Sequence, residues 1–244
     1  MSTPKSNFDR SLGVYLALLM TLLYAAPSSA VDPDTSRAAA NRAQPIGQGW
    51  QPVKEVEGIR IFHRRMHGSA YPQAMARTVF GAPPQRVHAV VSDYDHFADF
   101  IPYILESKTL GRREGIRWVY QRLRFPGPIF DRRYVIRIED LLGQARDGYY
   151  RVQWRLATNG IYPVPNRSGV VPTIMSGFWD LRPAADGTET DATYVVHLDP
   201  GGMLPAWLMS FAADRYLSKV IAGVRDRVHP VPREQPGPSG RRSE

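Results

Sequence analysis

The side chains that could do chemistry in this chain of 244 residues are few and widely spaced. The absence of cysteine excludes disulfides, thiolate nucleophiles and cysteine-ligated zinc or iron–sulfur clusters. The six histidines include one pair four residues apart, His63 and His67. That pair is predicted at a strand end and turn, where this spacing does not bring two imidazoles onto one metal. We therefore predict no metal site, and the common catalytic and nucleotide-binding motifs are missing.

Two polar groups could still act on a ligand. His197 is predicted in a strand, on the face opposite Tyr194 and Val196, and could serve as a general base if a pocket and Asp199 accompanied it. The simpler interpretation is a strand histidine that faces solvent or is hydrogen-bonded. The run 131–133, Asp-Arg-Arg, could supply an inward charge that orients a polar head, or it could be a solvated strand end. We assign no catalytic residue.

Apolar and polar side chains alternate through most of the chain, as in strands with one buried face. The pattern predicts two strands and a helix, then short helical turns, then a long antiparallel meander. The predicted strands are 59–65, 73–80, 105–112, 116–125, 132–141, 149–158, 177–182 and 191–198, with the helix at 85–92 and the turns at 93–103.

A long amphipathic helix follows the last predicted strand. The sequence Asp-Pro-Gly-Gly at 199–202 ends the strand, and Pro205 suits the first turn of a helix that runs to Val228. Apolar residues at helical spacing form one broad face from Met209 onward. Three of its residues are small: Ala212, Ala213 and Gly223. Either they leave space above the sheet for a ligand, or they let the backbones pack closely.

Aromatic and aliphatic residues predicted to face inward would surround that space. A curved sheet closed by a single helix leaves more volume than these side chains fill, so we expect an apolar pocket. The predicted ligand-binding residues are Trp118, Tyr120, Val152, Trp154, Trp179, Tyr194, Val196, Met209, Ala212, Ala213, Tyr216 and Val220.

A gate to this pocket is predicted where the last helix begins. Trp207 and Phe211 lie off the apolar stripe of the helix, and the loop 160–172 is long, rich in proline and partly apolar. These side chains could dock on a membrane, or Trp207 and Phe211 could simply pack against the loop. The predicted gate and membrane residues are Met203, Leu204, Trp207, Phe211, Tyr162 and Val164.

The order of elements resembles the helix-grip fold of the START and START-like (SRPBCC) superfamily, an α+β fold in which a curved antiparallel sheet grips a long C-terminal helix. Three stretches carry the resemblance: 130–135 (Phe-Asp-Arg-Arg-Tyr-Val), 199–208, which leads into the last helix, and 92–103. The likeness extends over about residues 50–228. It implies a cavity for a lipid, sterol or similar molecule and no cofactor. The superfamily also contains cyclases and aromatases.

The ends of the chain predict an exported protein. Lys5 and Arg10 precede an apolar run and then small residues up to Ala30, which is typical of a signal peptide and short for a membrane-spanning helix. We expect a signal peptide at 1–30, a linker at 31–48, the ligand-binding domain at 49–229 and a disordered tail at 230–244. In a bacterium this indicates the periplasm, with an uncleaved membrane anchor as the alternative.

We therefore predict a monomer that binds and transfers a hydrophobic ligand without covalent chemistry. The net charge of +8 suits transient contact with anionic membranes. Nucleic acid is not an expected partner, since no basic stripe or base-stacking motif stands out. Two alternatives remain: a cyclase or aromatase that acts on a polyketide-like substrate, and a partner protein without a ligand. A histidine that meets a carboxylate in the pocket would favour the cyclase.

Overall fold

The computed structural model describes residues 48–124, 129–140, 148–158, 160–165, 169–202 and 204–229, without the side chains of residues 206–208 and 211. The predicted signal peptide and tail lie outside the described residues, as does the predicted linker apart from its last residue. Within the described ranges, no helix is both long enough and apolar enough to cross a membrane.

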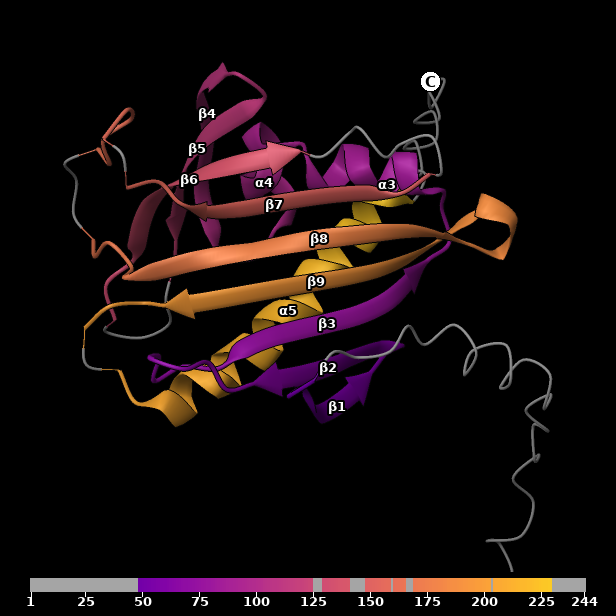
Figure 1. Cartoon of the computed structure of the whole chain (residues 1–244), viewed down its shortest axis with the longest axis horizontal. Helices are drawn as coiled ribbons and strands as arrows, with labels where there is room; N and C mark the ends of the chain where they lie inside the picture. The colour runs from indigo at the N-terminus through magenta and orange to yellow at the C-terminus, as the bar shows by residue number, and fades with distance from the viewer. Residues whose placement is uncertain are drawn as a thin grey trace, which may run out of the picture. The chain divides into compact units, whose positions relative to one another are not determined.

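The centre of the fold is one antiparallel sheet of nine strands in the order β1-β2-β3-β9-β8-β7-β6-β5-β4 (Figure 1). The strands are β1 (Gln51–Val56), β2 (Ile59–Arg64), β3 (Gln73–Phe80), β4 (Ile104–Arg113), β5 (Ile116–Leu123), β6 (Arg132–Asp140), β7 (Tyr150–Leu156), β8 (Ile174–Ala184) and β9 (Glu189–Asp199). The helices are α3 (Pro84–Val91), α4 (Phe97–Phe100) and α5 (Ala206–Val228), with single 3₁₀ turns η1 (Tyr94–His96) and η3 (Ala185–Gly187).

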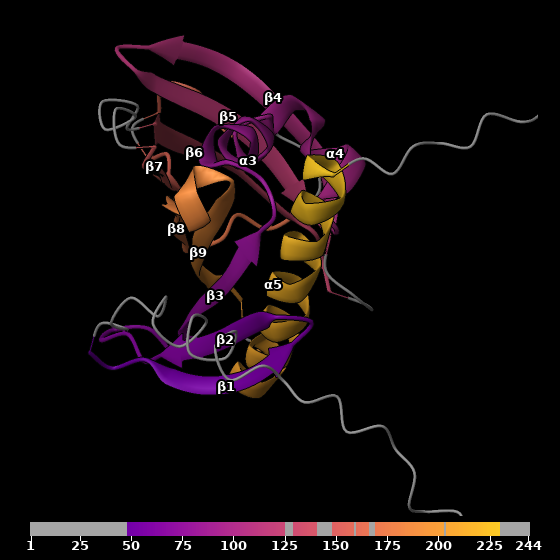
Figure 2. The same cartoon turned by 90° about the vertical axis from the view of Figure 1, so that its right-hand side faces the viewer.

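The sheet curves around α5, which crosses its concave side from end to end (Figure 2). Helices α3 and α4 close the same side at the C-terminal end of α5 (Figure 2). This arrangement confirms the predicted α+β helix-grip fold. Most of the buried apolar side chains form one cluster between the sheet and the helices.

The strand periodicity decides which side chains enter this cluster. In β7, Tyr150, Val152 and Trp154 are buried, whereas the alternate Arg151 and Gln153 lie on the convex face and remain partly exposed. Successive side chains of a strand point to opposite faces, so the alternation in the sequence predicts which side chains of β7 are buried.

The sequence did not reveal β1. All six residues of this edge strand are exposed, and its pairing with β2 shifts register between Pro52 and Lys54. A strand that buries neither face leaves no alternation of apolar residues. The prediction that the chain up to Gln48 precedes the domain is compatible with a first strand at Gln51.

Candidate functional site

A cavity of about 370 Å³ lies between the sheet and the N-terminal half of α5. Ligand pockets in proteins typically enclose roughly 300–1,000 Å³, so this one has room for a small apolar molecule or a single chain. Its lining is mostly apolar and comes from β3, β5 and the residue after it, β8, β9, α5 and the segments just before β3 and β4. The lining residues are Tyr71, Pro72, Ala74, Tyr103, Leu123, Arg124, Met175, Val196, Leu198, Met209, Ala212, Ala213, Arg215, Tyr216 and Leu217.

The small residues of α5 serve two different purposes. Ala212 and Ala213 line the cavity, as the ligand interpretation of the sequence requires. Gly223 does not line it: a Cβ at this position would lie 2.2 Å from the carbonyl oxygen of Phe100. Close packing of α5 against α4 therefore explains Gly223. Each of the two explanations therefore describes one part of the helix: open space at Ala212 and Ala213, and close packing at Gly223.

A second, inner chamber of about 40 Å³ lies deeper along α5. Met175 and Tyr216 line both spaces, so these two side chains form the partition between them. The other lining residues of the inner chamber are Val91, Tyr94, Phe97, Ile101, Ile104, Gln121, Ile136, Trp154, Trp179, Tyr194, Val220 and Val224.

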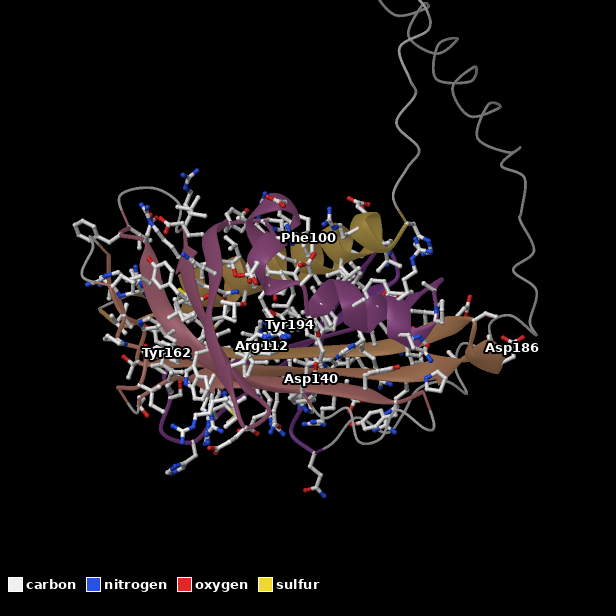
Figure 3. All side chains as sticks on the ribbon, turned by 90° about the horizontal axis from the view of Figure 1, so that it is seen from above. Phe100, Arg112, Asp140, Tyr162, Asp186 and Tyr194 are labelled. Carbon is white, nitrogen blue, oxygen red and sulfur yellow. The ribbon has the colours of Figure 1, made fainter. Side chains whose placement is uncertain are left out.

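The tyrosines around the partition are uncharged. Burial raises the pKa of Tyr216 to about 12 and that of Tyr194 well above its ordinary value. Burial likewise raises the pKa of Tyr134, whose hydroxyl donates to Oε1 of Gln121 at 3.2 Å. Figure 3 shows Tyr194 near the middle of the molecule, far from Asp186 at the tip of the β8–β9 hairpin. At neutral pH these hydroxyls can form hydrogen bonds but cannot act as bases.

Most of the predicted ligand-binding residues lie around the two spaces. Val196, Met209, Ala212, Ala213 and Tyr216 line the main cavity, and Trp154, Trp179, Tyr194, Tyr216 and Val220 line the inner chamber. Val152 is fully buried in the main core cluster and lines neither space.

Trp118 and Tyr120 lie on the wrong face for the predicted role. They form a separate buried cluster with Val135 on the convex side of the sheet. In β5 it is Val119 and Leu123 that join the concave core. The sequence analysis assigned the face with Trp118 and Tyr120 to the ligand space, whereas the structure turns the opposite face of β5 toward the helix.

The same cluster corrects two of the six predicted gate residues. Tyr162 and Val164 pack onto it, and the ring centroids of Tyr162 and Trp118 are 5.5 Å apart. These two residues therefore cover the convex face and do not border the cavity. The end of the same loop does approach the turn before α5, since a Cβ at Gly201 would lie 3.2 Å from the carbonyl oxygen of Val171.

The remaining predicted gate residues concern the start of α5. Leu204 packs against the main core, and its carbonyl oxygen accepts a hydrogen bond from Oη of Tyr71 at 2.9 Å. This bond ties the turn before β3 to the segment before α5, beside the cavity that Tyr71 lines. Met203 and the side chains of Trp207 and Phe211 lie outside the described residues, so their role stays a prediction.

His197 supports that turn from the convex face. It is 6% exposed, and its Nε2 lies 3.1 Å from Oγ of Ser69, two residues before Tyr71. Desolvation lowers the pKa of His197, so the imidazole is held in its neutral form. It is a hydrogen-bonded strand histidine, and it lines neither space.

The Asp-Arg-Arg run anchors two loops. Arg132 is 3% exposed and donates to the carbonyl oxygens of Pro200, at 2.7 Å, and Gly201, at 3.0 Å. Arg133 donates to the carbonyl oxygens of Pro165 and Gly169. Arg132 is therefore a buried loop anchor, contrary to the solvated strand end considered above, and neither arginine lines the cavities.

Among the described residues, three imidazole–carboxylate pairs lie outside the linings of both spaces, and one of them is the exposed pair of His96 and Asp93. Nε2 of His63 is 2.9 Å from Oδ1 of Asp214, between β2 and α5. Nε2 of His88 is 3.0 Å from Asp140 and 3.3 Å from Oγ of Ser92. In this last group the serine and the carboxylate approach the same nitrogen, whereas a catalytic triad uses both ring nitrogens.

Several cavity residues escaped the sequence analysis. Tyr71 and Pro72 lie in a turn, and Tyr103 has a left-handed backbone with φ of 70°. No periodicity marks such positions. Arg124 and Arg215 give the cavity wall two exposed positive charges, and Lys219 lies beside them, its Nζ donating to Oη of Tyr103 at 3.2 Å. A single basic residue in a sequence carries no sign that it borders a cavity.

Comparison with known proteins identifies a family that this chain matches. Residues 80–225 match the family described as polyketide cyclase / dehydrase and lipid transport. An uncharacterized protein of Pseudomonas aeruginosa is 28% identical over 183 residues, which cover 74% of this chain and 87% of that protein.

Solved structures give the same answer for the fold. A fragment of the STAR-related lipid transfer protein of Xanthomonas axonopodis superposes with a TM-score of 0.65 at 25% identity, covering 74% of this chain and 99% of that one. Human STARD10 also gives a TM-score of 0.65, at 16% identity, with 81% of this chain and 79% of that one covered. The fold is thus START-like.

Proposed function

Because the chain belongs to the polyketide cyclase / dehydrase and lipid transport family, whose members include both binding proteins and enzymes, we propose that it binds a hydrophobic molecule and transfers it between membranes. The observation that carries the proposal is the apolar cavity of about 370 Å³ beneath the N-terminal half of α5. Burial contributes roughly 0.8 kcal/mol per methylene, so even a short chain would be held firmly there.

Hydrogen bonds tie together the segments around the cavity. The turn before β3 and the segment before α5 are joined by the bond from Tyr71 to Leu204. Arg132 holds the turn at 199–202 against β6 from the other side. We propose that the start of α5 moves relative to the turn that carries Tyr71, and that Arg132 limits the movement.

A membrane-facing surface would lie beside this opening. Phe130 is 72% exposed and Val171 is 42% exposed, and their segments are adjacent because the backbone N–H of Val170 donates to the carbonyl oxygen of Asp131. Arg124 and Arg215 add positive charge at the cavity wall. Exposed apolar side chains next to cations favour contact with an anionic membrane. We propose that this contact follows export of the protein, in keeping with the N-terminal sequence.

Catalysis by a cyclase-like mechanism is the alternative. The described imidazole–carboxylate pairs lie outside the linings of both spaces, and burial raises the pKa of Tyr94, Tyr194 and Tyr216 in the linings. Among the described lining residues there is thus no group placed to take a proton from a bound substrate at neutral pH. This arrangement supports binding without turnover.

The proposal is tested with the full-length protein purified from its own source. Native mass spectrometry should show a bound mass, which lipid extraction should release as a hydrophobic compound. In a second assay the protein should speed transfer of a fluorescent single-chain lipid between anionic vesicles. A protein that carries no hydrophobic compound and leaves the transfer rate unchanged would exclude the proposed function.

A further inference from the structure

Two buried hydrogen-bond donors line the inner chamber without a partner. Oη of Tyr94 and Nε1 of Trp154 are shut off from solvent, and neither forms a hydrogen bond with any group in the described part of the chain. The two residues are only 4% and 8% exposed. Leaving a buried donor unpaired is destabilising, so two of them around one chamber indicate that something else supplies the acceptor.

The fold holds the Trp154 ring firmly in this position. The indole stacks on Tyr194 with ring centroids 5.8 Å apart, and Tyr194 stacks in turn on Trp179 at 4.5 Å. Gly177 pairs with Trp154 across the sheet, and a Cβ at Gly177 would lie 2.4 Å from Cζ2 of the indole. The glycine therefore makes room for this ring, and the unpaired N–H is a built feature of the sheet.

The opposite wall of the chamber supplies the second donor. Tyr94 begins η1, and the guanidinium of Arg117 lies 5.0 Å from its ring centroid. Burial raises the pKa of Tyr94, so its hydroxyl keeps the proton. A sheet residue and a helical residue thus bring two neutral donors to one small space.

The chamber selects an uncharged group. Its described lining contains no lysine, arginine, histidine, aspartate or glutamate. An indole N–H can only donate, so its partner must be an acceptor. An isolated charge would be strongly disfavoured here, because the described lining offers no counter-ion. The volume of about 40 Å³ admits an oxygen and an adjoining carbon or two but no bulky head.

We propose that the inner chamber binds the uncharged oxygen acceptor of a ligand, such as a ketone or ester carbonyl, while the apolar chain of that ligand fills the main cavity. The proposal rests on the proposed function, since it names the class of molecule that the cavity takes. The chain would pass between Met175 and Tyr216, which line both spaces.

The test compares two probes of equal length, 2-dodecanone and dodecane, by displacement of a fluorescent apolar dye. Tyr94→Phe should weaken binding of the ketone about three- to tenfold, as expected for one hydrogen bond, and leave the alkane unaffected. Trp154→Phe should have the same selective effect. Comparing each probe with itself in wild type and variant cancels the difference in probe hydration.

Tyr149→Phe is the matched control. Its hydroxyl already donates to Oδ2 of Asp180 at 2.8 Å, and neither residue lines the chamber or the main cavity. This variant should melt at a lower temperature than wild type, and the ratio of its affinities for the ketone and the alkane should be unchanged. Tyr94→Phe should melt no lower than wild type, since its hydroxyl forms no bond within the described part of the protein.

The outcomes separate the two proposals. If both probes bind the wild type and both donor variants weaken ketone and alkane equally, the inner chamber does not recognise an acceptor, and the proposed function stands. If neither probe binds the wild type and no other apolar compound displaces the dye, both proposals are wrong. A melting temperature for Tyr94→Phe as low as that of Tyr149→Phe would also overturn the unpaired-donor argument.

Discussion

The two halves of α5 treat small side chains in opposite ways. In the C-terminal half, Gly223 permits the backbone of α4 to approach so closely that a single methyl would collide with it. In the N-terminal half, Ala212 and Ala213 border a cavity of about 370 Å³. The packed half fixes the helix to the domain, and the open half is left for a ligand. A small residue on a helix therefore indicates either tight packing or empty space, and only the element opposite decides which.

The largest expected effect is a loss of stability when a methyl group is added to the packed half of α5. Gly223→Ala would place a Cβ 2.2 Å from the carbonyl oxygen of Phe100, which is backbone and cannot turn aside. We expect the free energy of unfolding to fall by about 3 kcal/mol, the upper range for overpacking. Denaturant titration measures this, with the exposed Asp226→Ala one turn away as a control that should change little. A Gly223→Ala protein as stable as the control would mean that α5 is not tightly packed against α4 at this position.

The next largest effect is a loss of affinity when a larger side chain fills the cavity beside the open half of α5. Ala213→Leu should place three carbon atoms in the cavity and exclude about three methylenes of ligand. At roughly 0.8 kcal/mol each, affinity for an apolar probe should fall about thirtyfold or more, while stability changes by less than about 1 kcal/mol. Titration with the dye measures the affinity. If Ala213→Leu binds as wild type does but unfolds like Gly223→Ala, the two halves do not differ as described.

A smaller effect concerns rates at the open end. Trp207→Ala combined with Phe211→Ala should slow lipid transfer between vesicles severalfold and leave affinity and melting temperature near wild type, if these aromatics dock on the membrane. Phe130→Ala tests the neighbouring exposed position in the same assay. Transfer at the wild-type rate in the double variant would assign membrane contact to another surface.

The smallest effect is a pH dependence beside the open half. Desolvation lowers the pKa of His197, so the folded protein resists a proton that the unfolded chain accepts below pH of about 6.5. Stability should therefore be flat above that pH and decline below it. His197→Gln should lessen the decline, measured as the difference between the two unfolding curves. His96 acts in the opposite direction, because Asp93 raises its pKa, but it is common to both proteins. If the stability of the two proteins changes with pH in parallel, His197 does not contribute to the pH dependence.

The sequence predicts the fold well because burial follows simple periods. The alternation in β7 and the helical stripe of α5 each bury one face, and the structure has both. The edge strand β1 escaped prediction because it buries neither face. Periodicity reports burial, so it fails where a strand is exposed throughout.

The candidate site is less predictable for the same reason. Trp118 and Tyr120 are buried as expected, but a loop covers them on the convex face, and no local pattern distinguishes a loop from a helix as the covering element. Tyr71 and Arg124 reach the cavity from a turn and a strand end, where no period applies. The register of strands and the course of loops are decided by contacts between distant segments.

One measurement tests the central claim directly: where a bound apolar chain touches the protein. A single-chain ketone that carries a photoreactive diazirine near its tail would be bound, irradiated and mapped by peptide mass spectrometry. The account predicts labels around Val196–Leu198 and Met209–Leu217, suppressed by excess unlabelled 2-dodecanone and by Ala213→Leu. Labels confined to the convex cluster of Trp118, Tyr120 and Tyr162, or labels that excess ligand does not suppress, would contradict it.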